Sequence, residues 1–123
     1  MPVFKFMEAL PSYDAAEVFY VRIDLAISTV EELMNAYYYL LWLPGYFGFN
    51  WDGLFDCLRD LRWIPCKKIV LVHASIPKLS KKDLRVYLEV LRDSILDWQN
   101  DEEHELEVVF RTADKATLEE LLR

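Results

Sequence analysis

The sequence predicts a single small α/β domain in which a three-stranded parallel sheet packs against helices. The chain has 123 residues, enough for one domain with a buried core but too few for two. Hydrophobic residues make up 54% of it, which excludes a disordered chain. Strand patterns alternate with helical patterns, so each connection between strands carries a helix and the strands should run parallel.

Three apolar segments predict the strands. The first is rich in Val, Phe, Tyr and Ile and is nearly continuously apolar, as expected for a strand covered on both faces. The predicted strands are residues 17–25, 69–72 and 106–110. Residues 3–7 alternate only loosely, which fits a short edge strand or a flexible leader. We therefore treat residues 1–16 as an N-terminal extension of a domain over residues 17–123.

Serine residues at two positions predict helix starts, because each is followed three residues later by an acidic residue, as in a capping box. The pairs are Ser28 with Glu31 and Ser80 with Asp83. After each pair apolar residues recur at helical spacing, over residues 30–41 and 84–98. A short helix over residues 115–123 should close the chain outside the core.

Several residues that often serve function are assigned structural roles. The tyrosines at residues 37–39 lie at helical spacing in the first helix, so we expect them to pack in the core. His73 follows a strand and has no nucleophile or acid near it in the sequence, which favours a structural histidine. Cys57 and Cys66 form neither a CxxC motif nor a metal cluster, so we expect reduced thiols and no metal or cofactor.

The three glycines of the chain all lie within residues 43–61. Glycine tolerates positive φ, and Pro44 disfavours helix at the residue before it, so residues 43–49 should form a bent, ordered turn. From Asn50, a good N-cap, apolar residues recur at helical spacing, which predicts a helix of about three turns over residues 51–61.

The outer side of this predicted helix is acidic. Asp52, Asp56 and Asp60 are spaced four residues apart, which places their Cβ atoms about 5–6 Å from one another along one side. Such like charges repel, and the helix dipole helps only Asp52, so folding alone does not explain the row. A cationic partner could use it.

Other interpretations of the acidic row are open. It can be a solvated face that keeps the domain soluble, or a module that binds a basic protein without inhibiting anything. Carboxylates also bind Mg²⁺ for phosphoryl transfer, but one helix offers a row rather than an octahedral arrangement, and no phosphate loop or base accompanies it. We therefore expect no enzymatic activity.

The charge balance restricts the partner. A formal net charge of −7 and a pI near 4.8 disfavour nucleic acid and anionic membranes and favour encounter with a basic protein. The longest unbroken apolar run, residues 36–43, is too short to span a bilayer, and the N-terminus lacks a signal-peptide pattern. We expect a cytoplasmic protein that is monomeric when free.

The motif from residue 43 to residue 61 resembles the signature of the barstar family, small intracellular proteins that inhibit barnase-type ribonucleases. The residues that carry the resemblance are Leu43-Pro44, Tyr46-Phe47-Gly48, Asn50, Asp52, Leu54 and Asp56-Cys57-Leu58. The resemblance implies the same three-stranded parallel sheet and a partner that is a basic, extracellular-type ribonuclease. It also implies that the motif helix and its preceding loop enter the active-site cleft of that enzyme.

The resemblance also implies roles for individual residues. Asp56 would occupy the pocket meant for a substrate phosphate, Asp52 would pair with nearby cations of the cleft, and Tyr46 would stack on the cleft wall. Asp93, in the later helix, would add a carboxylate contact. The complete predicted partner-binding surface consists of Tyr46, Gly48, Asn50, Asp52, Phe55, Asp56, Arg59, Asp60 and Asp93.

Two residues of this surface depart from the family pattern. Phe55 stands where the family has a tryptophan, so contact area is kept but an N–H donor is lost. Arg59 replaces a small polar residue one turn after Asp56. An arginine there can pair with Asp56 within the helix and would also face a cationic cleft.

Overall fold

The computed structural model describes residues 3–8, 18–23, 26–99 and 104–123. Its centre is a parallel sheet with the strand order β1-β4-β3-β2, which confirms the predicted α/β class. The strands are β1 (Lys5–Met7), β2 (Val18–Ile23), β3 (Lys68–His73) and β4 (Glu105–Arg111). Residues 17, 24 and 25 of the first predicted strand lie outside the described residues.

The predicted number of three strands was wrong, because β1 adds a fourth strand beside β4. Lys5 of β1 pairs with Val109 of β4 in parallel register. The rings of Phe4 and Phe6 lie 5.2 and 6.4 Å from the ring of Phe110, which fastens the strand to the core. Three residues are too few to show an alternation in the sequence, so tertiary packing decides that this segment is a strand. The boundary at residue 17 stays a prediction.

Four α-helices and two short 3₁₀ turns connect and flank the strands within the described residues. They are α1 (Val30–Leu40), η1 (Gly45–Phe47), α2 (Trp51–Asp60), α3 (Lys81–Trp98), η2 (Thr112–Asp114) and α4 (Lys115–Leu121). Two predicted N-caps are confirmed: the Asn50 side chain accepts from the Gly53 N–H, and the Ser80 hydroxyl accepts from the Asp83 N–H. Each satisfies a backbone donor that the helix itself leaves free.

The predicted cap of the first helix was one residue off. The N-cap is Thr29, whose hydroxyl oxygen accepts from the Glu32 N–H at 3.0 Å. The Glu32 carboxylate in turn accepts hydrogen bonds from the hydroxyls of Thr29 and Ser28. Two hydroxyl residues precede two glutamates here, so the sequence allows two capping registers and the structure selects the second.

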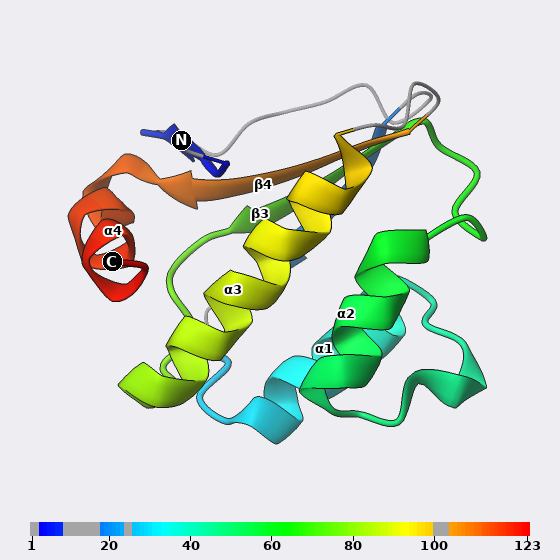
Figure 1. Ribbon diagram of the computed structural model, residues 1–123, viewed down its shortest axis with the longest axis horizontal. Coiled ribbons are helices and arrows are strands. Elements are labelled where there is room, and N and C mark those ends of the chain that lie inside the picture. Colours follow the sequence, from blue (N-terminus) through cyan, green and yellow to red (C-terminus); the bar gives the residue numbers. More distant parts are fainter. Residues whose placement is uncertain (1–2, 9–17, 24–25, 100–103) are drawn as a thin grey trace.

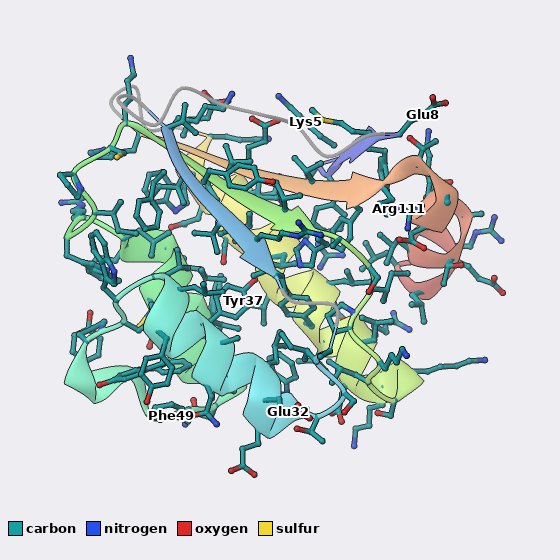
Figure 2. All side chains as sticks on the ribbon, turned by 180° about the vertical axis from the view of Figure 1, so that it is seen from behind. Lys5, Glu8, Glu32, Tyr37, Phe49 and Arg111 are labelled. Atoms are coloured by element: carbon teal, nitrogen blue, oxygen red, sulfur yellow. The ribbon has the colours of Figure 1, made fainter. Side chains whose placement is uncertain are left out.

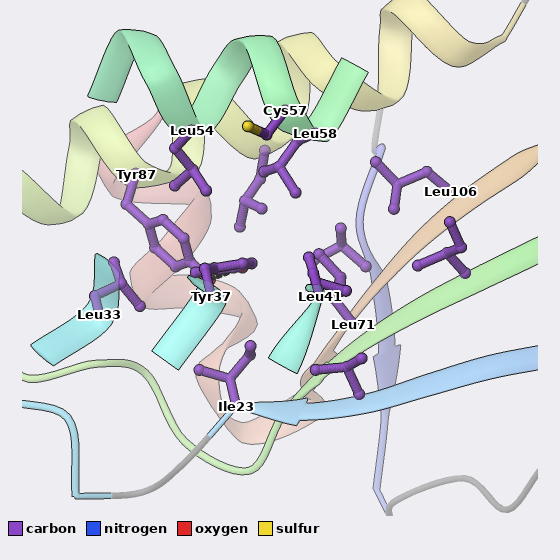
Figure 3. Packing of buried hydrophobic residues seen from close by; sticks show 14 of the residues in the cluster. Ile23, Leu33, Tyr37, Leu41, Leu54, Cys57, Leu58, Leu71, Tyr87 and Leu106 are labelled. Carbon is purple, nitrogen blue, oxygen red and sulfur yellow. Dashed lines mark hydrogen bonds between the residues drawn. The ribbon is translucent and has the colours of Figure 1, made fainter. Parts of the chain in front are cut away.

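The main core lies between one face of the sheet and helices α1, α2 and α3 (Figure 1, Figure 3). Strand residues reach it at alternating positions, because successive side chains of a strand point to opposite faces. The sheet contributes Val21, Ile23, Ile69, Leu71, Leu106, Val108 and Phe110. Val70, Val72 and Val109 form a separate buried cluster on the other face.

Helix α4 is part of this core, so its predicted place outside the core was wrong. Leu118 is only 1% exposed and belongs to the main buried cluster. Figures 1 and 2 place α4 at the opposite end of the molecule from α2. The helix therefore closes the end of the core that lies farthest from the acidic row.

A buried hydrogen-bond chain links β3, α3 and α1, and it confirms a structural role for His73. His73 Nδ1 donates to the carbonyl of Val109, its Nε2 accepts from the hydroxyl of Tyr87, and Tyr37 donates to Tyr87. This direction follows because the carbonyl can only accept and the imidazole is neutral. Burial lowers the pKa of His73 to about 3, the Val109 hydrogen bond opposing that shift.

A second polar group is buried on the opposite face of the sheet. The carboxylate of Glu107 in β4 lies 2.8 Å from the ammonium of Lys68 in β3 and 3.2 Å from that of Lys5 in β1. Burial by itself raises the pKa of Glu107, but the hydrogen bonds from Lys68 and Lys5 outweigh burial and hold that pKa below its usual value. The three side chains thus join three neighbouring strands.

Both cysteines are unpaired thiols, as predicted, with Cys57 buried and Cys66 half-buried. Burial raises the pKa of Cys57 to about 11, and the charges of Asp56 and Asp60 add to the shift. Within the described part of the chain, no helix has both the length and the apolar character needed to cross a membrane.

Candidate functional site

The loop before α2 is ordered by its own side chains, as the sequence predicts. Leu43 and Phe47 are buried in the core, and the turn η1, which ends at Phe47, is closed by a hydrogen bond from the Phe47 N–H to the Pro44 carbonyl. Gly48 follows with φ of 77°, a conformation that favours glycine. Between these anchors Tyr46 is 68% exposed, so the loop presents its ring to solvent.

The third glycine has a function that the sequence analysis did not identify. Gly53 lies in the first turn of α2, where a Cβ would overlap the carbonyl oxygen of Phe47 and stand 3.0 Å from its carbonyl carbon. The loop backbone therefore lies directly against the helix. This close approach, rather than a turn, requires glycine at residue 53.

Asn50 fixes the junction between the loop and the helix. Its Oδ1 accepts from the Gly53 N–H at 2.7 Å, and its Nδ2 donates to the Gly48 carbonyl at 3.4 Å. Both Gly48 and Asn50 are exposed, so they could be reached by a partner. Their contacts within the chain hold the loop and α2 in one fixed arrangement.

Helix α2 separates its apolar and acidic sides as predicted. Leu54, Cys57 and Leu58 are buried on the core side. On the outer side the Asp56 carboxylate is 61% exposed and that of Asp60 is 44% exposed. Asp52 in the first turn is also exposed. All three members of the predicted row are therefore accessible from solvent.

Two of the three acidic side chains have cationic partners within the chain. Arg59 Nη2 donates to Asp56 Oδ1 at 2.7 Å, and Arg62 Nε lies 3.7 Å from Asp60 Oδ1. Within the described residues, Asp52 has no ion-pair partner. As far as the structure describes the chain, the row thus contains one unpaired carboxylate, near the N-terminus of the helix, where the dipole also favours a negative charge.

Phe55 and Arg59 also contact each other. The guanidinium carbon of Arg59 lies 4.3 Å from the centre of the Phe55 ring, within the range of a cation–π interaction. The two residues that depart from the barstar pattern thus form a single unit with Asp56. The pairing of Arg59 with Asp56 was predicted from their spacing, whereas the contact of Arg59 with the ring was not.

Tyr46 belongs to the same electrostatic environment as α2. Desolvation raises its pKa above the usual value, and the charges of Cys57, Asp60 and Asp56 add to the rise. The phenol is therefore a neutral hydrogen-bond donor at neutral pH. Loop and helix thus present a hydroxyl donor beside carboxylate acceptors.

Asp93 is the one predicted site residue that lies on a different helix. It is exposed on α3, and its carboxylate lies 3.1 Å from Nε of its neighbour Arg92. Helices α2 and α3 are fastened together by a hydrogen bond of 2.7 Å from the Trp98 indole N–H to the Leu58 carbonyl. Asp93 therefore lies on the helix that packs against α2, and its carboxylate is already paired with Arg92 in the free protein.

Exposed aromatic residues beside the loop were missed by the sequence analysis. Tyr39, expected in the core with Tyr37, is instead 74% exposed, because two residues along a helix correspond to more than half a turn. The Tyr38 ring lies 5.3 Å from that of Tyr39 and 5.1 Å from that of Phe49, which continues the aromatic surface to the start of α2. Figure 2 shows Phe49 at the end of the molecule away from Arg111.

Two of the exposed aromatic residues have unusual backbone conformations. Trp42 and Phe49 both have φ of 53°, a left-handed conformation that is uncommon for bulky residues. Strained backbone of this kind concentrates at binding sites. Positive φ at a non-glycine residue has no sequence signature, although the aromatic density of residues 37–51 was a signal that could have drawn attention to this surface.

The acidic row does not form a metal site. Within the described residues, no group of three or more His, Cys, Asp or Glu side chains is arranged to hold a metal ion. Side chains spaced along one helix face diverge instead of surrounding a common point. The geometry therefore gives the magnesium alternative no support at α2.

Comparison with known proteins gives one result that covers most of the chain. The family model described as barstar (barnase inhibitor) matches residues 18–115, from the start of β2 to the start of α4. No individual curated protein matches. The family match includes the whole loop, α2 and α3. The chain therefore belongs to the barstar family.

Proposed function

We propose that this protein inhibits a basic, barnase-type ribonuclease by placing α2 and the preceding loop in the active-site cleft of the enzyme. The observation that carries the proposal is the exposed row of Asp52, Asp56 and Asp60 on a helix fixed to an aromatic loop. Membership of the barstar family supports it independently.

The physical basis is charge complementarity on a preorganised surface. A ribonuclease cleft gathers cationic side chains to bind phosphates, and carboxylates on a helix offer negative charge to the same groups. The contacts of Gly53 and Asn50 hold the loop against α2 before any partner arrives. Little conformational entropy is then lost on binding, and this favours affinity.

Asp52 should contribute more to binding than the family resemblance alone implies. The family resemblance assigns the phosphate pocket to Asp56, but Asp56 already carries Arg59 in the free protein. Asp52 has no such internal partner within the described residues. A cation of the nuclease therefore meets an unpaired charge at Asp52 and a paired one at Asp56.

The proposal places the protein in the cytoplasm as an immunity factor. A cell that makes a secreted ribonuclease must keep that enzyme inactive until it leaves, and an inhibitor inside the cell does so. A gene for a small secreted basic nuclease beside the gene for this chain would support this toxin–antitoxin arrangement.

The test is an inhibition titration with purified barnase-type ribonucleases and an RNA substrate. We expect activity to fall stoichiometrically with added protein, and both Asp52→Ala and Asp56→Ala to weaken inhibition at least about tenfold. Asp114→Ala is the control, because this residue precedes α4, which lies at the opposite end of the molecule from α2, and its side chain makes no capping bond. Full nuclease activity in excess protein, across several such enzymes, would refute inhibition.

A complex that forms while the nuclease stays active would identify the other class of protein, a non-inhibitory module for basic partners. Binding is therefore measured beside activity, by calorimetry with the same enzymes. Tight binding without loss of activity would replace the inhibitor proposal with the module, because the acidic surface would then contact the nuclease outside its cleft.

A further inference from the structure

Arg59 is a cation held in place within an acidic surface. Two contacts fix it, the 2.7 Å hydrogen bond to Asp56 and the Phe55 ring at 4.3 Å. The two partners precede it by three and four residues, so both lie on its own side of α2. A hydrogen bond between charged groups is stronger than one between neutral groups. The guanidinium is therefore a positive charge at a fixed place on the surface that α2 presents.

Arg59 retains donors for a second partner. A guanidinium has five N–H groups in a planar fork, and Asp56 accepts from Nη2. The side chain is 40% exposed, so solvent reaches it while it is bound to Asp56. Such a group can accept a carboxylate from another protein without releasing the first one.

Arg62 provides a contrast two positions beyond α2. It lies 3.7 Å from Asp60, and its side chain is 80% exposed. A long side chain with so little contact can turn away from an approaching cation at small cost. To turn away in the same manner, Arg59 would have to break its hydrogen bond to Asp56 and leave its contact with the Phe55 ring.

From these contacts we propose that Arg59 determines which nucleases the protein accepts, by requiring an acidic residue on the partner opposite α2. The inference rests on the proposed inhibitor function and specifies the partner. A cleft that offers only cations brings a positive charge against Arg59 in a desolvated interface, where like charges are costly. A cleft that adds one carboxylate pairs with the free donors of Arg59, while its cations pair with Asp52.

The experiment compares the wild type with Arg59→Ala and Arg62→Ala against a panel of purified barnase-type ribonucleases. Inhibition constants are measured for each pair. On the enzyme that the wild type inhibits best, we expect Arg59→Ala to raise the inhibition constant at least about tenfold. On enzymes that the wild type inhibits poorly, the same substitution should lower the constant by a similar factor. Arg62→Ala should change every constant by less than about threefold.

The best-inhibited enzyme then supplies the second half of the test. Its acidic residues near the cleft are replaced one at a time by Asn or Gln, and each variant is titrated with the wild type and with Arg59→Ala. One of these changes should strongly weaken inhibition by the wild type but hardly change inhibition by Arg59→Ala. The reason is that the change in the enzyme and the change at Arg59 remove the same contact.

The outcomes separate this inference from the inhibitor function. If inhibition persists but Arg59→Ala shifts all constants in one direction, or no acidic residue of the partner couples to Arg59, the inference is wrong and the function stands. If neither protein inhibits any enzyme of the panel, the function itself fails and the inference fails with it. Unchanged thermal unfolding of both variants, whose replaced side chains are exposed, excludes misfolding as the cause.

Discussion

Gly53 allows the backbone of the loop to lie directly against α2. Its substitution Gly53→Ala forces a Cβ against the Phe47 carbonyl, so the loop must move away from the helix. We expect a loss of at least about 2 kcal/mol in the free energy of unfolding, measured by urea denaturation. Inhibition should also weaken, because Tyr46 moves with the loop.

Gly45→Ala is the matched control for Gly53→Ala. An added Cβ at residue 45 has no atom within 4 Å. Replacing glycine by alanine at such a site reduces the entropy of the unfolded chain, so stability should stay equal or rise by up to about 1 kcal/mol. Equal losses for the two variants would show that the close approach at Gly53 is unimportant.

His73 should make the protein sensitive to acid. Its pKa is about 3 in the folded state against 6.5 ordinarily, so the unfolded chain binds one more proton once the pH falls below about 6.5. Stability from this residue is therefore present at neutral pH and is lost as the pH falls towards 3. Between pH 7 and pH 5 we expect the free energy of unfolding to fall by about 2 kcal/mol because of this residue.

The comparison for His73 is His73→Gln, which cannot titrate but can still hydrogen-bond. This variant should be less stable at pH 7, yet its stability should be nearly constant from pH 7 to pH 5. That window lies above the range in which most carboxylates become protonated, including Glu107. Identical pH dependence in both proteins, followed by urea unfolding at each pH, would assign the acid sensitivity to other groups.

At the scale of single elements, the start of α1 offers a sharp test of which hydroxyl caps the helix. Thr29→Ala removes the acceptor of the Glu32 N–H and should reduce stability by about 1 kcal/mol. Ser28→Ala removes only an exposed hydrogen bond to the Glu32 carboxylate and should stay within about 0.5 kcal/mol of the wild type. Thermal unfolding of the two variants measures this difference. A larger loss of stability for Ser28→Ala than for Thr29→Ala would identify Ser28 as the cap.

Helix α2 shows how far pattern recognition reaches at this scale. The spacing of its apolar residues and the Asn50 cap were sufficient to predict where it starts and which side is buried. The end of the helix was harder to predict. Leu61 is the C-cap, with φ of 50°, yet its side chain is buried like those of the helix residues before it. Burial of an apolar side chain looks the same in the sequence whether the residue lies inside the helix or caps it.

At the scale of the whole molecule, β1 raises the question of how much residues 1–16 contribute. The prediction that they are an extension means that residues 17–123 fold without them and keep the α2 surface. Loss of Phe4, Phe6 and the pairing with β4 should nevertheless reduce the free energy of unfolding by about 2–4 kcal/mol, measured by urea denaturation.

Lys5→Ala is the control for this truncation. Its side chain is half exposed, and Lys68 still holds Glu107 at 2.8 Å, so the loss should be below about 1 kcal/mol. Failure of residues 17–123 to fold would make β1 an integral strand and move the domain boundary to the start of the chain. Retained inhibition by the shortened protein would show that the binding surface is independent of β1.

The sequence by itself determined the α/β class, the parallel strands β2, β3 and β4, two of the helix caps and the exposed acidic row of α2. These features depend on local periodicity and on single capping residues, which can be read along the chain. Only the tertiary structure decided that β1 joins the sheet, that Leu118 closes the core and that Tyr39 faces solvent. It also decided that Arg59 pairs with Asp56 while Asp52 has no ion-pair partner among the described residues. Ion pairing depends on rotamers and on distances between side chains, and sequence spacing permits such contacts without selecting them.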